Sequence, residues 1–550
     1  MATILETRKE QALPKLTAVQ IARLERHGKR IRTHRNEVLA EPGDRNRHLL
    51  VVISGSIEIS RPGITGREVI TVHTPGDFAG EMSNLSGTGS FVRARMQEEG
   101  EVLAIDNEHL RTIVQTDAEL SELFMRAFIL RRVGLIASQQ GDVVLIGSRH
   151  SAATLRLQQF LTRNGVPYVG LDVDKDASVQ ALLDRFDVSV NDVPVVLCRG
   201  EQVLKNPSDE QIAWCLGLNP RIDHTRLRDL IVIGAGPAGL AAAVYAASEG
   251  LDVVVLEANA PGGQAGSSSK IENYLGFPTG ISGQALAGRA LVQSQKFGAE
   301  VAIASSALSL QCDRKPYEVQ SSCGQAMLAR AIVIATGAEY RTLALDNLPR
   351  FLGVGVYYAA TNVEARLCRD EEVIIVGGGN SAGQAAVFLA SSCRHVHLLV
   401  RSRGLAESMS RYLIRRIEDS PNITLHVRTE IAALEGDNRL EHVTWRSAAK
   451  DEMRDIKHVF LMTGAVPKTD WLRGCVALDE KGFVRTGSDL SAQDLTSARW
   501  PLARAPQLLE TSVAGVFAVG DVRSGSAKRV ASAVGEGSVC VQLVHRALQE

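Results

Sequence analysis

The sequence has no Cys-x-x-Cys pair, although it contains 8 cysteines among its 550 residues. So few cysteines do not form a disulfide scaffold, and without paired spacing neither a zinc ribbon nor a redox dithiol is evident. We therefore expect no metal site. A reducing compartment, the cytoplasm, fits this cysteine content best.

An excess of charge of one sign is also lacking. Lys plus Arg number 61 and Asp plus Glu 62, which gives a net charge of −1 and a pI near 6.9. Such a chain has no overall field that attracts a polyanion, so we expect no nucleic-acid partner.

Long apolar runs are few, and the N-terminus lacks the apolar core of a secretory signal. Two charge-free stretches, 230–248 and 374–393, reach the length of a membrane span. Each opens on a glycine cluster and contains Pro237 or Asn380. We expect a buried strand, a turn and a helix in both places, and no membrane association.

A length of 550 residues predicts three to four domains. Short alternating runs separated by glycines predict an antiparallel β-roll over 38–105, and helical periodicity flanks it at 18–29 and 107–133. Residues 141–218 follow the order βαβα and then β and α, which predicts a compact α/β unit. From residue 227 onward the chain contains two strand, glycine-turn and helix units that are weakly similar to each other.

The first unit carries Gly234-x-Gly236-x-x-Gly239 directly between an apolar strand and a helix, and Glu257 closes the next strand. Gly234 allows the tight turn, Gly236 lets the backbone approach a pyrophosphate at the helix N-terminus, and Gly239 admits close packing. Glu257 is placed to accept ribose hydroxyls. A purely structural glycine turn would not need this carboxylate, so we predict a dinucleotide site.

The second unit, Gly377-Gly-Gly379-Asn-Ser-Ala382, has alanine in the third glycine position. The spacing from Gly234 to Glu257, carried across, falls on Val400, and Arg401 and Arg403 follow it. The missing carboxylate and the two cations favour a 2′-phosphate and therefore NADPH over NADH. The alternative is that both arginines belong to a solvated loop.

Further matches occur in a fixed order along residues 227–548. They are Pro261-Gly-Gly-Gln264, Glu272-Asn-Tyr274, Ala335-Thr-Gly337, Thr463-Gly464 and Gly520-Asp521. With the two glycine motifs, they resemble the low-molecular-weight thioredoxin reductase family. The resemblance implies two Rossmann-like domains: an FAD-binding domain over 223–344 and 467–550, and an inserted NADPH-binding domain over 345–466. It also implies a homodimer.

The same resemblance implies the residues that bind each cofactor. For FAD they are Gly234, Gly236, Pro237, Ala238, Gly239, Glu257, Gly263, Gln264, Asn273, Ala335, Thr336, Gly337, Gly520, Asp521, Arg529, Val530 and Ala531. For NADPH they are Gly377, Gly379, Asn380, Ser381, Ala382, Arg401 and Arg403. Hydride is then expected to pass from the nicotinamide to the flavin.

The chain departs from that family where a dithiol would precede the second glycine motif, because Ala359 and Asn362 stand there. Thiol exchange needs one thiolate to attack and another to resolve, so these residues cannot relay electrons to a disulfide. We expect little reduction of thioredoxin. Cys368 is expected to be a buried packing residue, while a spatial pair of Cys368 with Cys393 stays open.

The segment 139–222 resembles the thioredoxin and glutaredoxin fold, with Val193-Pro194 at the position of its cis-proline turn. The active-site turn would be Ser148-Arg-His150-Ser151, with serine in place of cysteine. A serine hydroxyl forms no disulfide, and His150 is expected to be a solvated loop residue. We therefore expect this domain to be redox-silent and to serve docking or spacing.

The N-terminal region contains Glu41-Pro-Gly43-Asp44, Val51-Val-Ile-Ser-Gly55-Ser-Ile-Glu-Ile and Pro75-Gly-Asp-Phe-Ala-Gly80-Glu81-Met. With these motifs, residues 1–138 resemble cyclic-nucleotide-binding domains, which implies that Gly80 and Glu81 belong to the phosphate-binding cassette. The arginine that should pair the cyclic phosphate is missing, since Ser90 or Phe91 stands there and Arg93 and Arg95 lie further on. A cyclic-nucleotide ligand is therefore left open. Because no helix-turn-helix segment follows, a transcription factor is not expected.

We predict an FAD-dependent NADPH oxidoreductase that passes electrons from the flavin directly to a small-molecule or small-protein acceptor, under regulation by its N-terminal domain. One alternative is a redox or nucleotide sensor whose flavin does not turn over. Another is a thioredoxin-disulfide reductase that uses cysteines outside the family motif.

Overall fold

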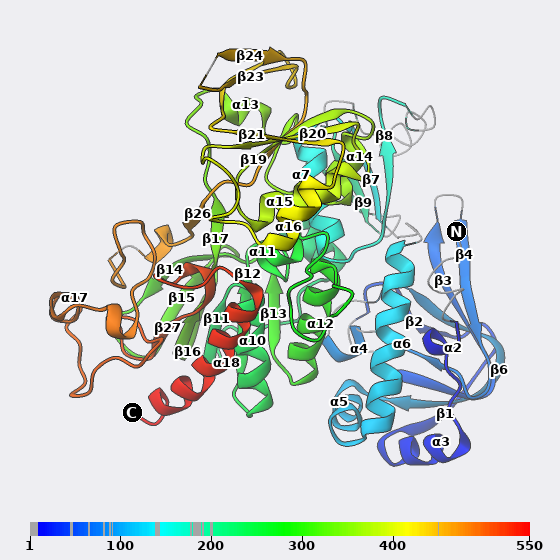
Figure 1. Ribbon diagram of the computed structural model, residues 1–550. Coiled ribbons are helices and arrows are strands. Elements are labelled where there is room, and N and C mark those ends of the chain that lie inside the picture. The colour runs from blue at the N-terminus through cyan, green and yellow to red at the C-terminus, as the bar shows by residue number, and fades with distance from the viewer. Residues whose placement is uncertain are drawn as a thin grey trace.

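The computed structural model describes residues 9–44, 48–63, 66–80, 83–86, 90, 92–137, 143–175, 179, 189, 192–198, 202–448, 450–472 and 474–550. Within these ranges the strands form six sheets. Figure 1 shows the N-terminal elements (blue) beside helix α12 (Gly283–Lys296) of the central region. Strands β7 (Val143–Gly147) and β9 (Val195–Cys198) lie beside the yellow-green region.

The N-terminal sheet is entirely antiparallel and has the order β1-β6-β3-β4, with β2 on β6 and β5 on β3. Its strands are β1 (Lys29–Thr33), β2 (Val38–Ala40), β3 (Leu49–Gly63), β4 (Gly66–His73), β5 (Phe78–Ala79) and β6 (Arg93–Ile105). The helices around it are α2 (Lys9–Ala12), α3 (Ala18–Leu24), η1 (Glu25–His27), α4 (Ser83–Ser86), α5 (Asn107–Thr116) and α6 (Ala118–Ala137). The predicted β-rich domain with flanking helices is confirmed.

Three of its boundaries differ from the prediction. The runs expected as two strands over 48–61 are one strand, β3, whose register shifts where Gly55 takes a φ of 77°. The first helix stops before Lys29, which begins β1. The helix predicted over 107–133 is broken at Asp117, whose carboxylate accepts from Leu120 N at 3.0 Å and starts a new helix.

The second sheet has the order β10-β9-β7-β8, in which β7 and β8 are parallel and β9 is antiparallel to both β7 and β10. Its elements are β7 (Val143–Gly147), α7 (Ala152–Arg163), β8 (Tyr168–Asp172), β9 (Val195–Cys198), β10 (Gln202–Lys205) and α9 (Asp209–Leu216). Strand β10 was not predicted, and the helix expected over 178–186 lies outside the described residues except for Val179. The Val193–Pro194 peptide is cis.

The third sheet has seven strands in the order β13-β12-β11-β16-β15-β14, with β27 parallel to β16. The strands are β11 (Arg228–Ile233), β12 (Val253–Glu257), β13 (Glu300–Ile303), β14 (Ala307–Gln311), β15 (Tyr317–Ser321), β16 (Ala326–Ile334) and β27 (Val516–Ala518). Helices α10 (Pro237–Ser248), α12 (Gly283–Lys296) and α18 (Val530–Ala547) pack together beside it, with α11 (Gly263–Gly266) and η5 (Gly520–Val522) at their ends. Phe160 and Leu161 of α7 belong to the same buried cluster as Ala243 and Val301, so this core continues into the second sheet.

The fourth region is a parallel sheet in the order β18-β25-β19-β20-β21. Its elements are β18 (Val356–Tyr357), α14 (Asn362–Leu367), β19 (Glu372–Val376), α15 (Asn380–Ala390), β20 (His395–Val400), α16 (Arg411–Glu418), β21 (Ile423–Val427) and β25 (Val459–Leu461). The antiparallel pair β17 (Ala338–Tyr340) and β26 (Ala465–Pro467) joins it to the third sheet. A small sheet of β22 (Glu430–Glu435), β23 (His442–Arg446) and β24 (Asp451–Arg454), absent from the prediction, is inserted before β25.

Cysteine pairing differs from the expectation at one place, because Cys312, after β14, forms a disulfide with Cys475. In the described part of the chain no helix is long and apolar enough to cross a membrane. The described residues also include no group of three or more side chains that could hold a metal ion.

Candidate functional site

The first glycine motif forms the turn between β11 and α10. Gly234 has a φ of 105°, and a Cβ there would lie 2.3 Å from the carbonyl oxygen of Ala335. A Cβ on Gly239 would lie 1.8 Å from the carbonyl oxygen of Gly234. Only glycine fits at both positions, so the helix begins directly against the end of the strand.

The space in front of this turn fits a dinucleotide diphosphate. Gly236 is the N-cap of α10 and makes no side-chain cap, so the first backbone N–H groups of the helix are available to an anion. A Cβ on Gly236 would meet nothing closer than the Cα of Gly263, at 3.9 Å. Pro237, Ala238 and Gly239 form the first turn of the helix, as the motif predicts.

Glu257 ends β12 and is buried beside the same turn. Its carboxylate accepts from Ala235 N at 2.7 Å, from Asn259 N at 2.9 Å and from Ala260 N at 3.2 Å. It therefore ties the glycine turn to the following loop, and its remaining lone pairs are available to ribose hydroxyls.

The other residues predicted for FAD lie on elements around the start of α10. Gln264 of α11 donates to Ala338 O at 2.6 Å, and the Thr336 hydroxyl donates to Lys468 O at 2.9 Å. Residues Ala335 and Gly337 belong to the same turn after β16, and Arg529, Val530 and Ala531 begin α18, which packs on η5. Asn273 is exposed in the loop between α11 and α12.

Gly520 and Asp521 form the start of η5. Gly520 N donates to the Glu536 carboxylate at 2.7 Å, which fixes η5 against α18. Burial raises the pKa of Asp521, while the charge of Lys528 opposes that shift. Lys528 Nζ donates to the backbone oxygen of Asp521 at 2.5 Å, so the loop that presents this carboxylate is held at both ends.

The second glycine motif repeats the geometry between β19 and α15. Gly377 has a φ of 146°, and a Cβ there would lie 2.2 Å from Met462 O. Gly379 is an N-cap without a side-chain cap, and a Cβ on it would meet open space. Asn380 accepts from Ser410 N at 2.7 Å, which fixes the first turn of the helix. Ser381 lies in that turn, and Ala382 is fully buried behind it.

Arg401 and Arg403 follow β20 and are exposed. Neither guanidinium is in a salt bridge with another described residue, so both are available to a phosphate that binds beyond the carboxyl end of β20. They lie one and three residues past Val400, which ends β20 as Glu257 ends β12 in the first unit.

Residues 359 and 362 flank the N-terminus of α14. Thr361 is the N-cap of this helix and exchanges hydrogen bonds with Glu364, which is fully buried. Ala359 is half-buried and Asn362 is exposed, and neither side chain carries a thiol. Helix α7 of the second sheet lies against this segment: Gln159 donates to Glu364 at 2.6 Å, and Leu155 packs in one cluster with Tyr357 and Ala360.

Residues 228–537 match the family described as Pyridine nucleotide-disulphide oxidoreductase, and residues 30–117 match the cyclic nucleotide-binding domain. This protein belongs to the pyridine nucleotide-disulphide oxidoreductase family. It is thus an FAD-dependent NAD(P)H oxidoreductase of thioredoxin reductase type, with a cyclic nucleotide-binding domain at its N-terminus, and its cofactors are FAD and NADPH.

Its curated relatives include thioredoxin reductases. That of Bacillus subtilis is 29% identical over 331 residues, covering 60% of this chain and 97% of the relative. That of Mycolicibacterium smegmatis is 32% identical over 314 residues, covering 56% and 93%. Among solved structures, T. acidophilum thioredoxin reductase is 26% identical, covers 58% of this chain and 98% of its own, and has a TM-score of 0.52.

Two cysteines of this oxidoreductase that are far apart in the sequence meet behind α14. The sulfur atoms of Cys368 and Cys393 lie 3.6 Å apart, and both side chains are buried. The hydrogen bond between the thiols raises the pKa of Cys368, and burial adds to this shift. The expectation that Cys368 is buried holds, but it packs against a second thiol, which only the fold could reveal.

The serines of the predicted turn in the second sheet have local structural contacts. Ser148 donates to Asp174 at 2.7 Å, and Ser151 is the N-cap of α7, accepting from Thr154 N at 3.3 Å. His150 is exposed in this turn. These contacts are those of a helix start, with no group that activates a nucleophile.

The cyclic nucleotide-binding domain is described only in part at its predicted site, because Glu81 and Phe91 lie outside the described residues. Gly80 O accepts from Arg131 of α6 at 2.8 Å. Arg93 donates to Glu41 at 2.7 Å, and Arg95 lies 3.4 Å from Glu58. Both arginines considered as substitutes for the missing phosphate ligand are therefore already engaged by carboxylates.

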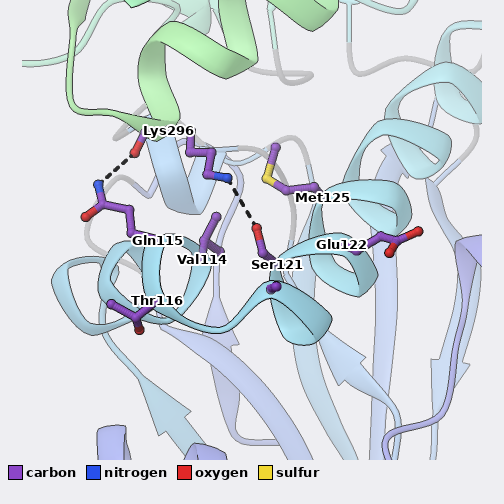
Figure 2. A pocket seen from close by; sticks show the side chains of 8 residues that line it. Val114, Gln115, Thr116, Ser121, Glu122, Met125 and Lys296 are labelled. Atoms are coloured by element: carbon purple, nitrogen blue, oxygen red, sulfur yellow. Dashed lines mark hydrogen bonds between the residues drawn. The ribbon is translucent and has the colours of Figure 1, made fainter. Parts of the chain in front are cut away.

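This domain is docked on α12 of the oxidoreductase. Gln115 of α5 donates to Lys296 O at 3.1 Å, and Lys296 Nζ lies 3.4 Å from the hydroxyl of Ser121 (Figure 2). These residues line a pocket of about 450 Å³ together with Val114, Thr116, Ala118, Glu122 and Met125. Sequence reasoning missed this junction because Lys296 lies about 180 residues from its partners.

Proposed function

We propose that this oxidoreductase passes electrons from its flavin directly to a small acceptor, such as a quinone or a one-electron carrier, and does not reduce thioredoxin disulfide. The observation that supports this most is the pair Ala359 and Asn362 beside the N-terminus of α14. A disulfide acceptor needs two thiols in relay, and these side chains offer none.

The contact of α7 with α14 supports the same conclusion. Gln159 donates to the buried Glu364, and Leu155 packs with Ala360 beside the half-buried Ala359, while Asn362 stays exposed. A separate disulfide protein that approached position 359 would have to fit around α7. A small acceptor that approaches the flavin elsewhere would not.

The overall reaction balances without a thiol: NADPH, a proton and a quinone give NADP⁺ and a hydroquinone. Bound FAD would supply the two-electron chemistry. In this proposal the backbone at the start of α10 binds the FAD diphosphate, Glu257 binds its ribose and Asp521 its ribityl chain. The start of α15 binds the NADPH diphosphate, and Arg401 with Arg403 binds the 2′-phosphate.

The proposed domain limits follow the sheets: 1–138 for the cyclic nucleotide-binding domain, 139–222 for a thioredoxin-like domain, 345–466 for NADPH, and 223–344 with 467–550 for FAD. The strand order β10-β9-β7-β8, with only β7 and β8 parallel, supports the thioredoxin-like assignment. Its serine turn makes it a redox-silent docking domain. The proposal includes a homodimer, as the family resemblance implies, and a location in the cytoplasm, as the low cysteine content indicates.

Regulation by the N-terminal domain is part of the proposal. The contacts of Gln115 and Ser121 with Lys296 connect that domain to α12, whose other end packs on α11 at the FAD loop. A cyclic nucleotide is the ligand that the domain family suggests. The engagement of Arg93 and Arg95 by carboxylates means that such a ligand would have to break an existing ion pair to recruit either arginine.

A second candidate function is a thioredoxin-disulfide reductase that uses Cys368 and Cys393. The 3.6 Å between their sulfur atoms favours it, since a small movement would form a disulfide. Their burial argues against it, because a relay thiol must reach its substrate.

Steady-state oxidation of NADPH tests both candidates, with thioredoxin disulfide, a quinone and ferredoxin as acceptors. We expect turnover with the quinone or ferredoxin and none with thioredoxin, unchanged in the double variant Cys368→Ala with Cys393→Ala. Cys540→Ala, another buried cysteine, is the matched control. Thioredoxin reduction that disappears only in the double variant would establish the second candidate. A flavin bleached by NADPH that no acceptor reoxidises would indicate a sensor.

A further inference from the structure

Arg163 is a half-buried cation, and in the described part of the chain no carboxylate lies within salt-bridge distance of it. It ends α7, and its Nη2 donates to the carbonyl oxygen of Gly263 at 3.1 Å, across the junction between the second sheet and the FAD loop. Its Nε atom is buried and has no hydrogen-bond partner among the described residues. This guanidinium therefore uses only part of its hydrogen-bonding capacity.

The junction around Arg163 is closely packed. Gln284 of α12 donates to Thr162 O at 2.6 Å, and Asn164 donates to Asn259 O at 3.2 Å. Phe160, one turn earlier, is fully buried in the core that α7 shares with α10. Since backbone and core contacts hold both sides, Arg163 is positioned by the fold and is not free to swing into solvent.

The positive charge of Arg163 is not balanced by a nearby carboxylate among the described residues. Burial lowers the pKa of Arg163, and only the more distant charges of Glu257 and Glu364 oppose that shift. In the described part of the chain neither carboxylate is within salt-bridge distance of it. By contrast, Arg156 of the same helix is paired with Asp209, and the exposed Lys468 with Glu339. A guanidinium whose Nε is buried without a hydrogen-bond partner carries an uncompensated desolvation cost, which points to an anion that binds there.

The anion is identified by what lies next to Gly263. A Cβ on Gly263 would lie 3.1 Å from the Cα of Gly236, so the backbone that Arg163 holds is packed on the N-cap of α10. We propose that Arg163 is an FAD-binding residue contributed by the thioredoxin-like domain, which fixes the Gly263 loop and supplies positive charge for the cofactor's diphosphate. The inference rests on the proposed placement of FAD at the first glycine motif. It makes the otherwise redox-silent domain part of the flavin site.

The test is FAD affinity, measured by adding FAD to the full-length apoprotein and following flavin fluorescence at two salt concentrations. Arg163→Gln should raise the dissociation constant about tenfold or more, because a charge-assisted hydrogen bond to a phosphate is lost. It should also reduce the salt dependence of binding. Arg163→Lys should bind FAD more tightly than Arg163→Gln, since lysine keeps the charge but lacks the paired N–H donors of the guanidinium. The matched control is Arg156→Gln, on the same helix.

Circular dichroism and thermal unfolding of each apoprotein separate a binding effect from misfolding. An Arg163→Gln protein that unfolds like Arg156→Gln but binds FAD more weakly supports the inference. Equal FAD affinity in the wild type and Arg163→Gln overturns it, and so does equal weakening in Arg156→Gln. If Arg163→Gln does not fold, Arg163→Lys decides: wild-type salt dependence with weaker binding supports the role, and wild-type affinity overturns it. A wild type that binds no FAD would instead overturn the placement of FAD itself.

Discussion

The two glycine motifs have the same backbone geometry, but the side chains at and after the end of the following strand differ. Gly234 and Gly377 both have positive φ, and a Cβ on either would lie within 2.3 Å of a carbonyl oxygen of the neighbouring strand's turn. Gly236 and Gly379 are both N-caps without a side-chain cap. At the end of the next strand the first unit has the buried Glu257, and the second has the exposed Arg401 and Arg403.

This difference separates two tasks that a dinucleotide site must perform. Phosphate binding is done by bare backbone at a helix N-terminus, so it is the same in both units. Selection of the nucleotide is done by side chains after the following strand, so it differs between them. Variants that remove these features test phosphate binding and nucleotide selection separately.

The largest effect is expected from filling either phosphate space. Gly236 and Gly379 have φ values of −69° and −91°, which valine tolerates, so both proteins should fold. Gly236→Val should weaken FAD binding by about a hundredfold or more, whereas Gly379→Val should keep the flavin and raise the KM for NADPH by a similar factor. Absorbance of the purified proteins and steady-state kinetics measure the two effects.

The control for these variants is Gly288→Ala, in the middle of α12, where a Cβ meets open space. It should change neither property. A Gly236→Val protein that retains a full equivalent of FAD would show that the diphosphate does not lie at the start of α10.

A smaller effect is expected at Glu257. The carboxylate accepts hydrogen bonds from three backbone N–H groups, and the amide of Glu257→Gln has only one acceptor oxygen for them. The free energy of unfolding of the apoprotein should therefore fall by about 1.5–3 kcal/mol. FAD affinity should fall as well, because the ribose loses an acceptor. Urea unfolding of the apoprotein and FAD titration give the two numbers separately. An unchanged free energy of unfolding would show that Glu257 does not stabilise the glycine turn.

Nucleotide preference should respond to the arginines of the second unit. The double variant Arg401→Ala with Arg403→Ala should lose about 1–3 kcal/mol of the preference for NADPH over NADH, since neither arginine is in a salt bridge with another described residue. The ratio of kcat/KM for the two nucleotides measures it. Arg394→Ala, at the other end of β20 and paired with Glu372, is the matched control. A wild type that prefers NADH would contradict the assignment.

The smallest effect concerns the ion pair that joins the two units, Arg416 with Glu272. The hydrogen bond from Arg416 lowers the pKa of Glu272. Its contribution to stability is therefore complete above the ordinary glutamate pKa of about 4.3 and is lost as the pH falls through the lower folded value. Because Arg416 is half-exposed, we expect only about 0.5 kcal/mol.

Unfolding of the wild type and of Arg416→Met at pH 7 and near pH 3 measures this contribution. The two proteins should differ at pH 7 and converge at the lower pH. A difference that persists at the lower pH would show that Arg416 acts through packing and not through its charge.

The sequence predicted the local motifs correctly but missed some strands and the contacts between distant segments. The glycine turns and the place of Glu257 at the end of β12 follow from spacing within about 25 residues, where backbone geometry leaves little choice. Strand β10 was missed because four residues carry too weak a period. The inserted sheet β22-β23-β24 was missed as well, since it has no motif of its own.

Contacts between domains could not be predicted from one sequence. The hydrogen bond of Gln159 to Glu364 spans about 200 residues, and the approach of Arg163 to Gly263 spans 100. Neither side chain stands out in composition or periodicity, because each belongs to an ordinary amphipathic helix. Cys368 and Cys393 lie within one domain and only 25 residues apart, but their meeting was left open because it depends on how α14 and α15 pack together.

Anaerobic reoxidation of the flavin tests direct electron transfer most simply. The enzyme is first reduced with one equivalent of NADPH, then mixed rapidly with oxidised thioredoxin or with a quinone, while the flavin absorbance is followed. We expect rapid return of the absorbance with the quinone, and with thioredoxin no return beyond the rate in buffer alone. Reoxidation by thioredoxin at the rate of steady-state turnover would contradict it.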